Sequence, residues 1–61
     1  MNIKKMREKR NLTQENLAEI LNVSQSTVAM WETDKALPRA DKLPAIAKAL
    51  GCTIDDLLNG E

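Results

Sequence analysis

Residues 13–32 read TQENLAEILNVSQSTVAMWE, and this stretch decides the fold. It contains two short segments in which apolar residues recur at the spacing of an α-helix, so that each segment has one apolar face. The residues that form these faces are Leu17, Ala18, Leu21, Val28 and Trp31. The stretch therefore predicts two amphipathic helices in close succession.

Hydroxyl residues precede both segments and can cap the helices. Thr13 precedes the first segment and Ser24 the second. Asn22 lies between them, and asparagine tolerates the left-handed conformation that ends one helix and redirects the chain. We expect helices over residues 14–21 and 25–33. Such a pair is either a packing scaffold or presents its second helix to a ligand.

The length and composition predict one domain, spanning residues 1–61. This is near the lower size limit for folding without disulfides or a bound metal. With one cysteine and no histidine, neither an internal disulfide nor a zinc site of the usual ligands can form. No apolar run approaches the ~20 residues that cross a bilayer. No signal peptide is visible. We expect a cytoplasmic protein with no metal, no cofactor and no membrane partner.

Charge is distributed unevenly although the net charge is zero. Residues 1–10 hold five basic residues and one acidic residue, a balance of +4, and the remainder holds four basic and eight acidic residues, a balance of −4. A nearby polyanion responds to local charge within about 8–10 Å, the Debye length. The basic segment is either a surface for a polyanion or a solvated face.

A helix is predicted before the central stretch, over residues 3–10. Asn2 can cap it, and Ile3 and Met6 face inward one turn apart. After the central stretch, residues 34–39 form a loop in which Leu37 is the expected inward anchor.

Two more helices complete the chain. Residues 43–50 carry an apolar stripe, with Pro44 in the first turn and Gly51 after the end. The last helix spans residues 54–59 and is closed by Gly60. No segment predicts a strand, so we expect an all-α, compact five-helix domain.

Motif residues along the whole chain match one known family. They are Arg7, Gln14, Leu17-Ala18, Leu21-Asn22-Val23, Gln25-Ser26, Val28, Trp31-Glu32, Pro38 and Leu43 to Gly60. With them the chain resembles the phage repressor/Cro-type (XRE-like) helix-turn-helix family. Asn22 departs from the pattern, because the family often has glycine there. The resemblance implies a lambda-repressor-like fold, with the helix-turn-helix formed by residues 14–21 and 25–33, and a bacterial or phage origin.

The resemblance implies that the helix over residues 25–33 enters the major groove of double-stranded DNA. The implied base contacts are Gln25, Ser26, Ala29 and Met30. Gln25 suits adenine N6 and N7, Ser26 suits a base edge or a phosphate, and the two apolar residues suit a thymine methyl. The alternatives to base contact are a solvated surface amide for Gln25 and, for Met30, a partly exposed side chain that fills a gap in the packing.

Phosphate contacts are implied at the start of the helix over residues 14–21, where free amides favour an anion. Thr13 and Gln14 lie there, and five more phosphate contacts are expected around the same face or in the loop after residues 25–33: Arg10, Thr27, Lys35, Arg39 and Lys42. In the family, the glutamine at the position of Gln14 also braces the one at the position of Gln25. Each of these side chains has a plain alternative role on a solvated surface. The acidic residues Asp55, Asp56 and Glu61 are expected far from the DNA.

The resemblance also implies an ion pair between Arg7 and Glu32 that orients the second helix of the pair. The alternative is two exposed charges, which contribute under about 1 kcal/mol.

These expectations predict a sequence-specific transcriptional regulator, a repressor that binds a palindromic operator. Catalysis is not expected, because no nucleophile–base arrangement is present, and no small-molecule ligand is implied. A homodimer, formed in solution or only on DNA, is expected to use Leu57 and Leu58. The alternatives are a protein-interaction module such as an antitoxin, or the DNA-binding part of a longer ligand-sensing regulator. The start at Met1 favours a complete small protein over such a part.

Overall fold

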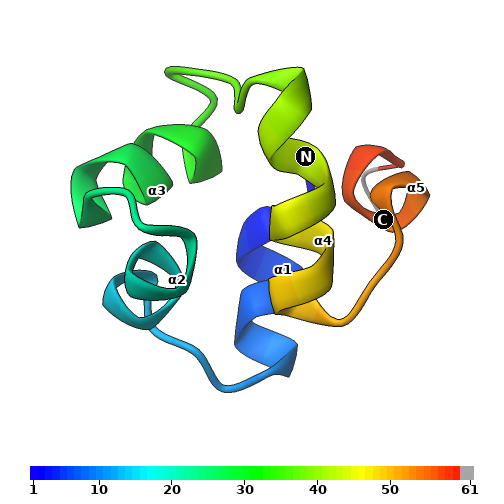
Figure 1. The fold of residues 1–61 in the computed structure, drawn as a ribbon, viewed down its shortest axis with the longest axis horizontal. Helices are drawn as coiled ribbons and strands as arrows, with labels where there is room; N and C mark the ends of the chain where they lie inside the picture. Colours follow the sequence, from blue (N-terminus) through cyan, green and yellow to red (C-terminus); the bar gives the residue numbers. More distant parts are fainter. Residues whose placement is uncertain (60–61) are drawn as a thin grey trace.

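The computed structural model describes residues 1–59 and consists of helices joined by short connections (Figure 1). The elements are α1 (Ile3–Lys9), α2 (Gln14–Leu21), α3 (Gln25–Glu32), the 3-10 helix η1 (Ala40–Lys42), α4 (Leu43–Leu50) and α5 (Ile54–Leu58). No strand occurs among the described residues. The prediction of an all-α, five-helix fold is confirmed.

Helices α2 and α4 have the predicted bounds, whereas α1, α3 and α5 each end one residue earlier than predicted. Left-handed residues explain two of these ends. Asn11 has φ 58° and follows the cap of α1, and Asp34 has φ 61° and follows the cap of α3. A right-handed helix cannot continue through such a residue. The predicted closing residue Gly60 lies outside the described residues, as does Glu61.

Capping defines the two central helices as expected. Thr13 accepts a hydrogen bond from the backbone N–H of Asn16, and the Asn16 side chain accepts one from the Thr13 N–H, which completes a capping box. Ser24 accepts from the backbone N–H of Thr27. Asn22 takes the left-handed conformation, with φ 60° and ψ 42°, and ends α2. These local contacts set the angle at which α3 leaves α2.

A single apolar core lies between the helices. Helices α2 and α3 pack together on one side of α1 and α4, and α5 packs against the other side of α4 (Figure 1). The core residues are Ile3, Leu17, Ala18, Leu21, Val28, Trp31, Ile46, Ala47, Leu50 and Leu57. Trp31 is 6% exposed and thus belongs to the core. This packing leaves the start of α3 at the surface.

Two predictions about inward and outward residues are wrong. Leu37 is 70% exposed, and the neighbouring Pro38 is the buried residue of the α3–α4 connection. Leu57 is fully buried, because the last helix turns this side chain into the core, so it cannot contact a second copy of the chain. Leu58, the other residue predicted for a dimer contact, is 50% exposed.

Asn2 precedes α1 but does not cap it with its side chain, contrary to prediction. Its side-chain amide Nδ2 instead donates to the backbone carbonyl of Asp56 at 3.1 Å, and its backbone N–H donates to that of Leu57 at 2.9 Å. The side chain therefore ties the start of the chain to α5, which is a contact between residues far apart in sequence.

None of the helices within residues 1–59 is long and apolar enough to span a membrane. In the same part of the chain, no group of three or more His, Cys, Asp or Glu residues is arranged to hold a metal ion.

The left-handed Asn22 makes a prediction about stability. An L-residue with a side chain is strained in this conformation and glycine is not, although asparagine is the least penalised. We expect Asn22→Gly to change the free energy of unfolding by between 0 and about +1 kcal/mol, and Asn22→Ala to lower it by about 1 kcal/mol. Chemical denaturation of the three proteins measures both. A glycine variant less stable than the alanine variant would contradict the strain argument.

Candidate nucleic-acid interface

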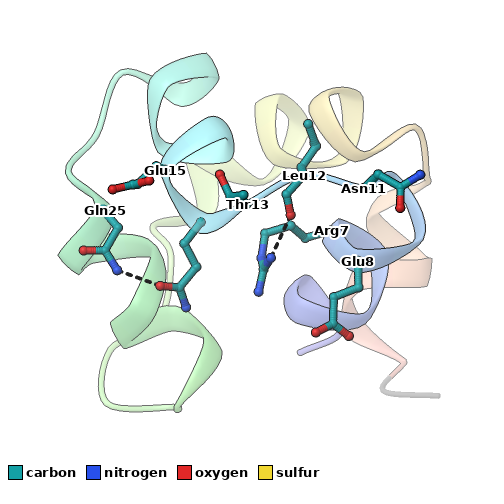
Figure 2. A pocket seen from close by; sticks show the side chains of 8 residues that line it. Arg7, Glu8, Asn11, Leu12, Thr13, Glu15 and Gln25 are labelled. Atoms are coloured by element: carbon teal, nitrogen blue, oxygen red, sulfur yellow. Dashed lines mark hydrogen bonds between the residues drawn. The ribbon is translucent and has the colours of Figure 1, made fainter.

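A buried ion pair joins α1 to the end of α3. Arg7 is 9% exposed, and the Glu32 side chain is 2% exposed. Arg7 Nε donates to Glu32 Oε2 at 2.7 Å, and Arg7 Nη2 donates to Glu32 Oε1 at 3.1 Å. Arg7 Nη1 donates to the backbone carbonyl of Leu12 at 2.7 Å, so the guanidinium also holds the connection between α1 and α2 (Figure 2). This bidentate geometry is among the stronger hydrogen-bonding arrangements in proteins.

Both members of the pair are held in their charged forms. Burial on its own would raise the pKa of Glu32, but hydrogen bonds from Arg7 and Gln14 and the positive charge of Arg7 outweigh it and lower that pKa. The hydrogen bond to Glu32 raises the pKa of Arg7 against the opposing effect of burial. The carboxylate is therefore ionised at neutral pH and acts only as a hydrogen-bond acceptor.

Two glutamines extend this arrangement to the protein surface. Gln14 is the first residue of α2, and its Nε2 donates to Glu32 Oε1 at 2.9 Å. Gln25 is the first residue of α3, and its Nε2 donates to Gln14 Oε1 at 2.6 Å (Figure 2). A continuous chain of hydrogen bonds therefore runs from the carbonyl of Leu12 through the ion pair to an exposed side chain. It brings the first residues of α2 and α3 together.

The residues predicted for base contact all lie on α3, and their exposure differs. Gln25 and Ser26 are exposed, Ala29 is half-buried, and Met30 is 39% exposed. The opposite face of α3 holds Val28, which is fully buried, and Trp31. The start of α3 is therefore the more accessible part of this face.

Six of the seven residues predicted for phosphate contact lie in three places. Thr13 and Gln14 lie at the start of α2, and Thr27 lies in the first turn of α3, where its hydroxyl is 2.8 Å from that of Ser24. The α3–α4 connection carries Lys35 and Arg39, which are exposed, and ends in η1, which contains the half-buried Lys42.

Arg10 lies in a different environment. A Cβ atom built on Gly51 would be 2.6 Å from Arg10 Nη1, so the guanidinium lies directly against this glycine at the C-terminal end of α4. A cation is favourable there because it faces the negative end of the helix dipole. Arg10 is therefore directed toward α4 and not toward the two glutamines.

Three residues of the hollow that Gln14 and Gln25 also line were missed from sequence. Glu8, Asn11 and Glu15 line a hollow together with Arg7, Thr13 and Gln25 (Figure 2). Glu15 is the most relevant, because it places a carboxylate in the first turn of α2 beside the two glutamines. Its position directly after Gln14 was the available signal. Such a carboxylate stabilises the helix start and repels an anion there.

The fold and the paired helices α2 and α3 define a protein of the helix-turn-helix class. A helix-turn-helix family model matches residues 3–57. The chain belongs to the phage repressor/Cro-type (XRE-like) helix-turn-helix family.

Three relatives are each similar to 97% of this chain. The HTH-type transcriptional activator BcrR of Enterococcus faecalis is 44% identical, and the match covers 29% of that protein. The Repressor protein C2 of Salmonella phage P22 is 34% identical over 27% of its length. The Immunity repressor protein of Bacillus phage phi105 is 41% identical over 41% of its length. The chain thus spans less than half the length of each of these relatives.

The burial of the ion pair makes a prediction about stability. Glu32→Ala leaves the Arg7 guanidinium buried without its partner, which costs about 3–5 kcal/mol of unfolding free energy. For a domain of this size we expect the melting temperature to fall by about 10 °C or more. Glu19→Ala, at an exposed position on α2, serves as the control and should change it little. Equal melting temperatures for the two variants would show that the pair is not buried in solution.

The lowered pKa of Glu32 makes a second prediction, about pH. The stability that the Glu32 carboxylate contributes is present above 4.5, the pKa of this group in the unfolded chain. It is lost as the pH falls toward the lower pKa of the folded protein. Below pH 4.5 the wild type should therefore lose unfolding free energy more steeply than Glu32→Gln, by up to about 1.4 kcal/mol per pH unit. Denaturant unfolding between pH 7 and 3 measures the two curves. Parallel curves would contradict the lowered pKa.

Proposed function

We propose that this chain is the DNA-binding domain of a transcriptional regulator and that α3 reads a sequence in the major groove. The observation that carries the proposal is the held position of Gln25. This side chain is exposed, yet its amide is fixed by Gln14, which is itself fixed by a buried carboxylate. A side chain ordered before binding loses less entropy when a ligand binds. The family supports this reading, because transcriptional regulators are among its members.

The proposed base contacts follow from the chemistry of α3. After it donates to Gln14, the Gln25 amide retains its Oε1 and a second N–H. These match the N6 donor and the N7 acceptor of adenine. Ser26 suits a base edge or a phosphate, and Ala29 and Met30 suit a thymine methyl.

The proposed phosphate contacts lie on both sides of these base contacts. The Thr13 side chain already accepts from the Asn16 N–H, whereas the backbone amides of Gln14 and Glu15 have no acceptor within the helix, so these two are available to an anion. Thr27 offers a hydroxyl near the start of α3, and the α3–α4 connection supplies Lys35, Arg39 and Lys42. Arg10 is left out, because its guanidinium lies against Gly51.

The zero net charge is compatible with this proposal. Two acidic residues, Asp55 and Asp56, lie on α5, across α4 from α2 and α3 (Figure 1). A DNA backbone at α3 is then separated from these charges by the width of the protein, where salt screens them.

We propose a homodimer on a palindromic site. The longest dimension of the domain is 24 Å, which corresponds to about seven base pairs at a rise of ~3.4 Å each. Useful specificity then needs two half-sites, read by two copies about one helical turn apart. Leu58 on α5 is the exposed apolar residue proposed for the contact between copies.

We propose repression as the regulatory outcome, on the ground that two of the three relatives are named as repressors. The third is named as an activator, so a domain of this kind is compatible with either repression or activation of transcription. A reporter gene placed downstream of the selected site measures the sign directly.

Selection of bound duplexes from a random library, at two salt concentrations, tests the function. We expect enrichment of an inverted repeat and weaker binding at the higher salt, because displaced counterions favour release. Failure to enrich any sequence would overturn the proposal and leave a protein-interaction module as the role of this domain.

Two substitutions separate the proposed roles of single residues. Gln25→Ala should relax the preference at one base position in each half-site, at a cost of about 1–3 kcal/mol for the preferred base. Lys35→Ala should weaken all sequences alike and make the salt dependence shallower. Binding titrations on the selected site and on single-base variants measure both. Equal relaxation in the two variants would contradict the assignment of Gln25 to a base.

A further inference from the structure

We propose that Glu32, which lies away from the exposed start of α3, determines which hydrogen-bonding atoms Gln25 presents to DNA. The proposal rests on the proposed function and deepens it by assigning a positioning residue for base specificity. The path runs through one amide, that of Gln14, which contacts Glu32 at 2.9 Å and Gln25 at 2.6 Å.

The direction of each hydrogen bond in this path follows from the chemistry of its inner end. A carboxylate only accepts hydrogen bonds. Gln14 must therefore turn its NH2 group toward Glu32, since the opposite amide orientation would place two acceptors against each other. The Gln14 Oε1 then faces outward and accepts from whatever lies next to it. Gln25 can satisfy it only by donating from Nε2.

The inner end of the path has little freedom. The Glu32 side chain is 2% exposed. Its two carboxylate oxygens accept hydrogen bonds from Arg7, from Nε at 2.7 Å and from Nη2 at 3.1 Å. Arg7 is in turn fixed to the backbone carbonyl of Leu12. Among the described residues, no buried side-chain nitrogen or oxygen atom lacks a partner. The carboxylate is thus held both in place and in its charged state.

The outer end of the path therefore has a defined pattern. Gln25 retains Oε1 and one N–H, an acceptor beside a donor. Adenine presents a donor and an acceptor in the major groove and is complementary to this pattern, whereas guanine presents two acceptors. Two acceptors would require two donors from the protein.

Replacing the carboxylate by an amide allows the whole path to reverse. In Glu32→Gln, the new amide oxygen can face only one of the two Arg7 donors that the carboxylate binds, Nε at 2.7 Å and Nη2 at 3.1 Å. With the oxygen on Nε, the closer donor, Nη2 loses its acceptor and the new NH2 group faces Gln14. Gln14 turns its Oε1 inward and its NH2 group outward. Gln25 accepts with Oε1 and presents its own NH2 group, two donors, to the groove. The variant is expected to favour guanine where the wild type favours adenine.

The test compares base preference in the wild type and in Glu32→Gln by the same library selection, followed by titrations on the four single-base variants of the Gln25 position. We expect the adenine-to-guanine preference at that position to shift by about fivefold or more toward guanine. Preferences at the other positions should remain. Uniform loss of affinity, with the preference for adenine retained, would overturn the proposal and leave Glu32 a purely structural role.

Two control variants separate the expected shift from general effects. Ile46→Val removes one methyl group from the core and lowers stability without touching the path. Asp55→Asn removes one negative charge on α5, far from α3. Both should retain the adenine preference of the wild type. A shift toward guanine in either control would overturn the proposal, because the shift would then follow from stability or charge.

A second variant tests the path without removing the buried charge. Gln14→Met interrupts the link at a half-buried position and leaves the ion pair intact. It should relax the preference at the Gln25 position, and adding Glu32→Gln to it should produce no further change in base preference. A further shift toward guanine in the double variant would show that Glu32 does not act through Gln14. A wild type that lacks any base preference would overturn the proposed function itself, which is a different outcome from each of these.

Discussion

The buried ion pair between Arg7 and Glu32 is the interaction on which the rest of the site depends. Burying two charges costs several kcal/mol of desolvation per ion, and apolar residues of similar volume often give equal or greater stability. The pair is therefore not explained by stability alone. Its geometry supplies another reason: it joins α1, the α1–α2 connection and the end of α3, and it offers Gln14 an acceptor of fixed direction.

Helix α3 needs this polar support because it has few apolar contacts of its own. It is eight residues long, and only Val28 and Trp31 are buried. An isolated helix of this length is not stable in water. The apolar contacts hold α3 against the core, while the hydrogen bonds of Gln25 at its start and Glu32 at its end fix its position along and around its axis. A helix that reads bases requires that second kind of constraint, because a displacement of about 1 Å breaks a hydrogen bond.

Local sequence signals predicted most of the fold, and contacts between distant residues account for the errors. Caps, apolar periodicity and the left-handed Asn22 depend on neighbours in the chain, and they placed the helices correctly to within one residue. Leu37 was expected to be buried, but the neighbouring Pro38 is the buried residue. Which of two adjacent loop residues faces inward depends on the helices that the loop joins. Leu57 was misjudged because either side of a five-residue helix can face the core. The family resemblance supplied the two glutamines, but the link from Gln14 to Glu32 required the structure.

The placement of charges explains why hydrogen bonds have to contribute so much to the proposed interface. Arg10, one of five basic residues in the N-terminal segment, lies against the C-terminal end of α4, and Glu15 places a negative charge beside the two glutamines. The proposed phosphate contacts include three basic residues, Lys35, Arg39 and Lys42, which lie in the α3–α4 connection and η1. Each phosphate that is neutralised contributes about one unit to the salt dependence of binding. Three basic contacts therefore give weak nonspecific attraction to DNA. A domain with weak nonspecific attraction distinguishes its site by oriented donors and acceptors, and the orientation of Gln25 comes from the buried carboxylate.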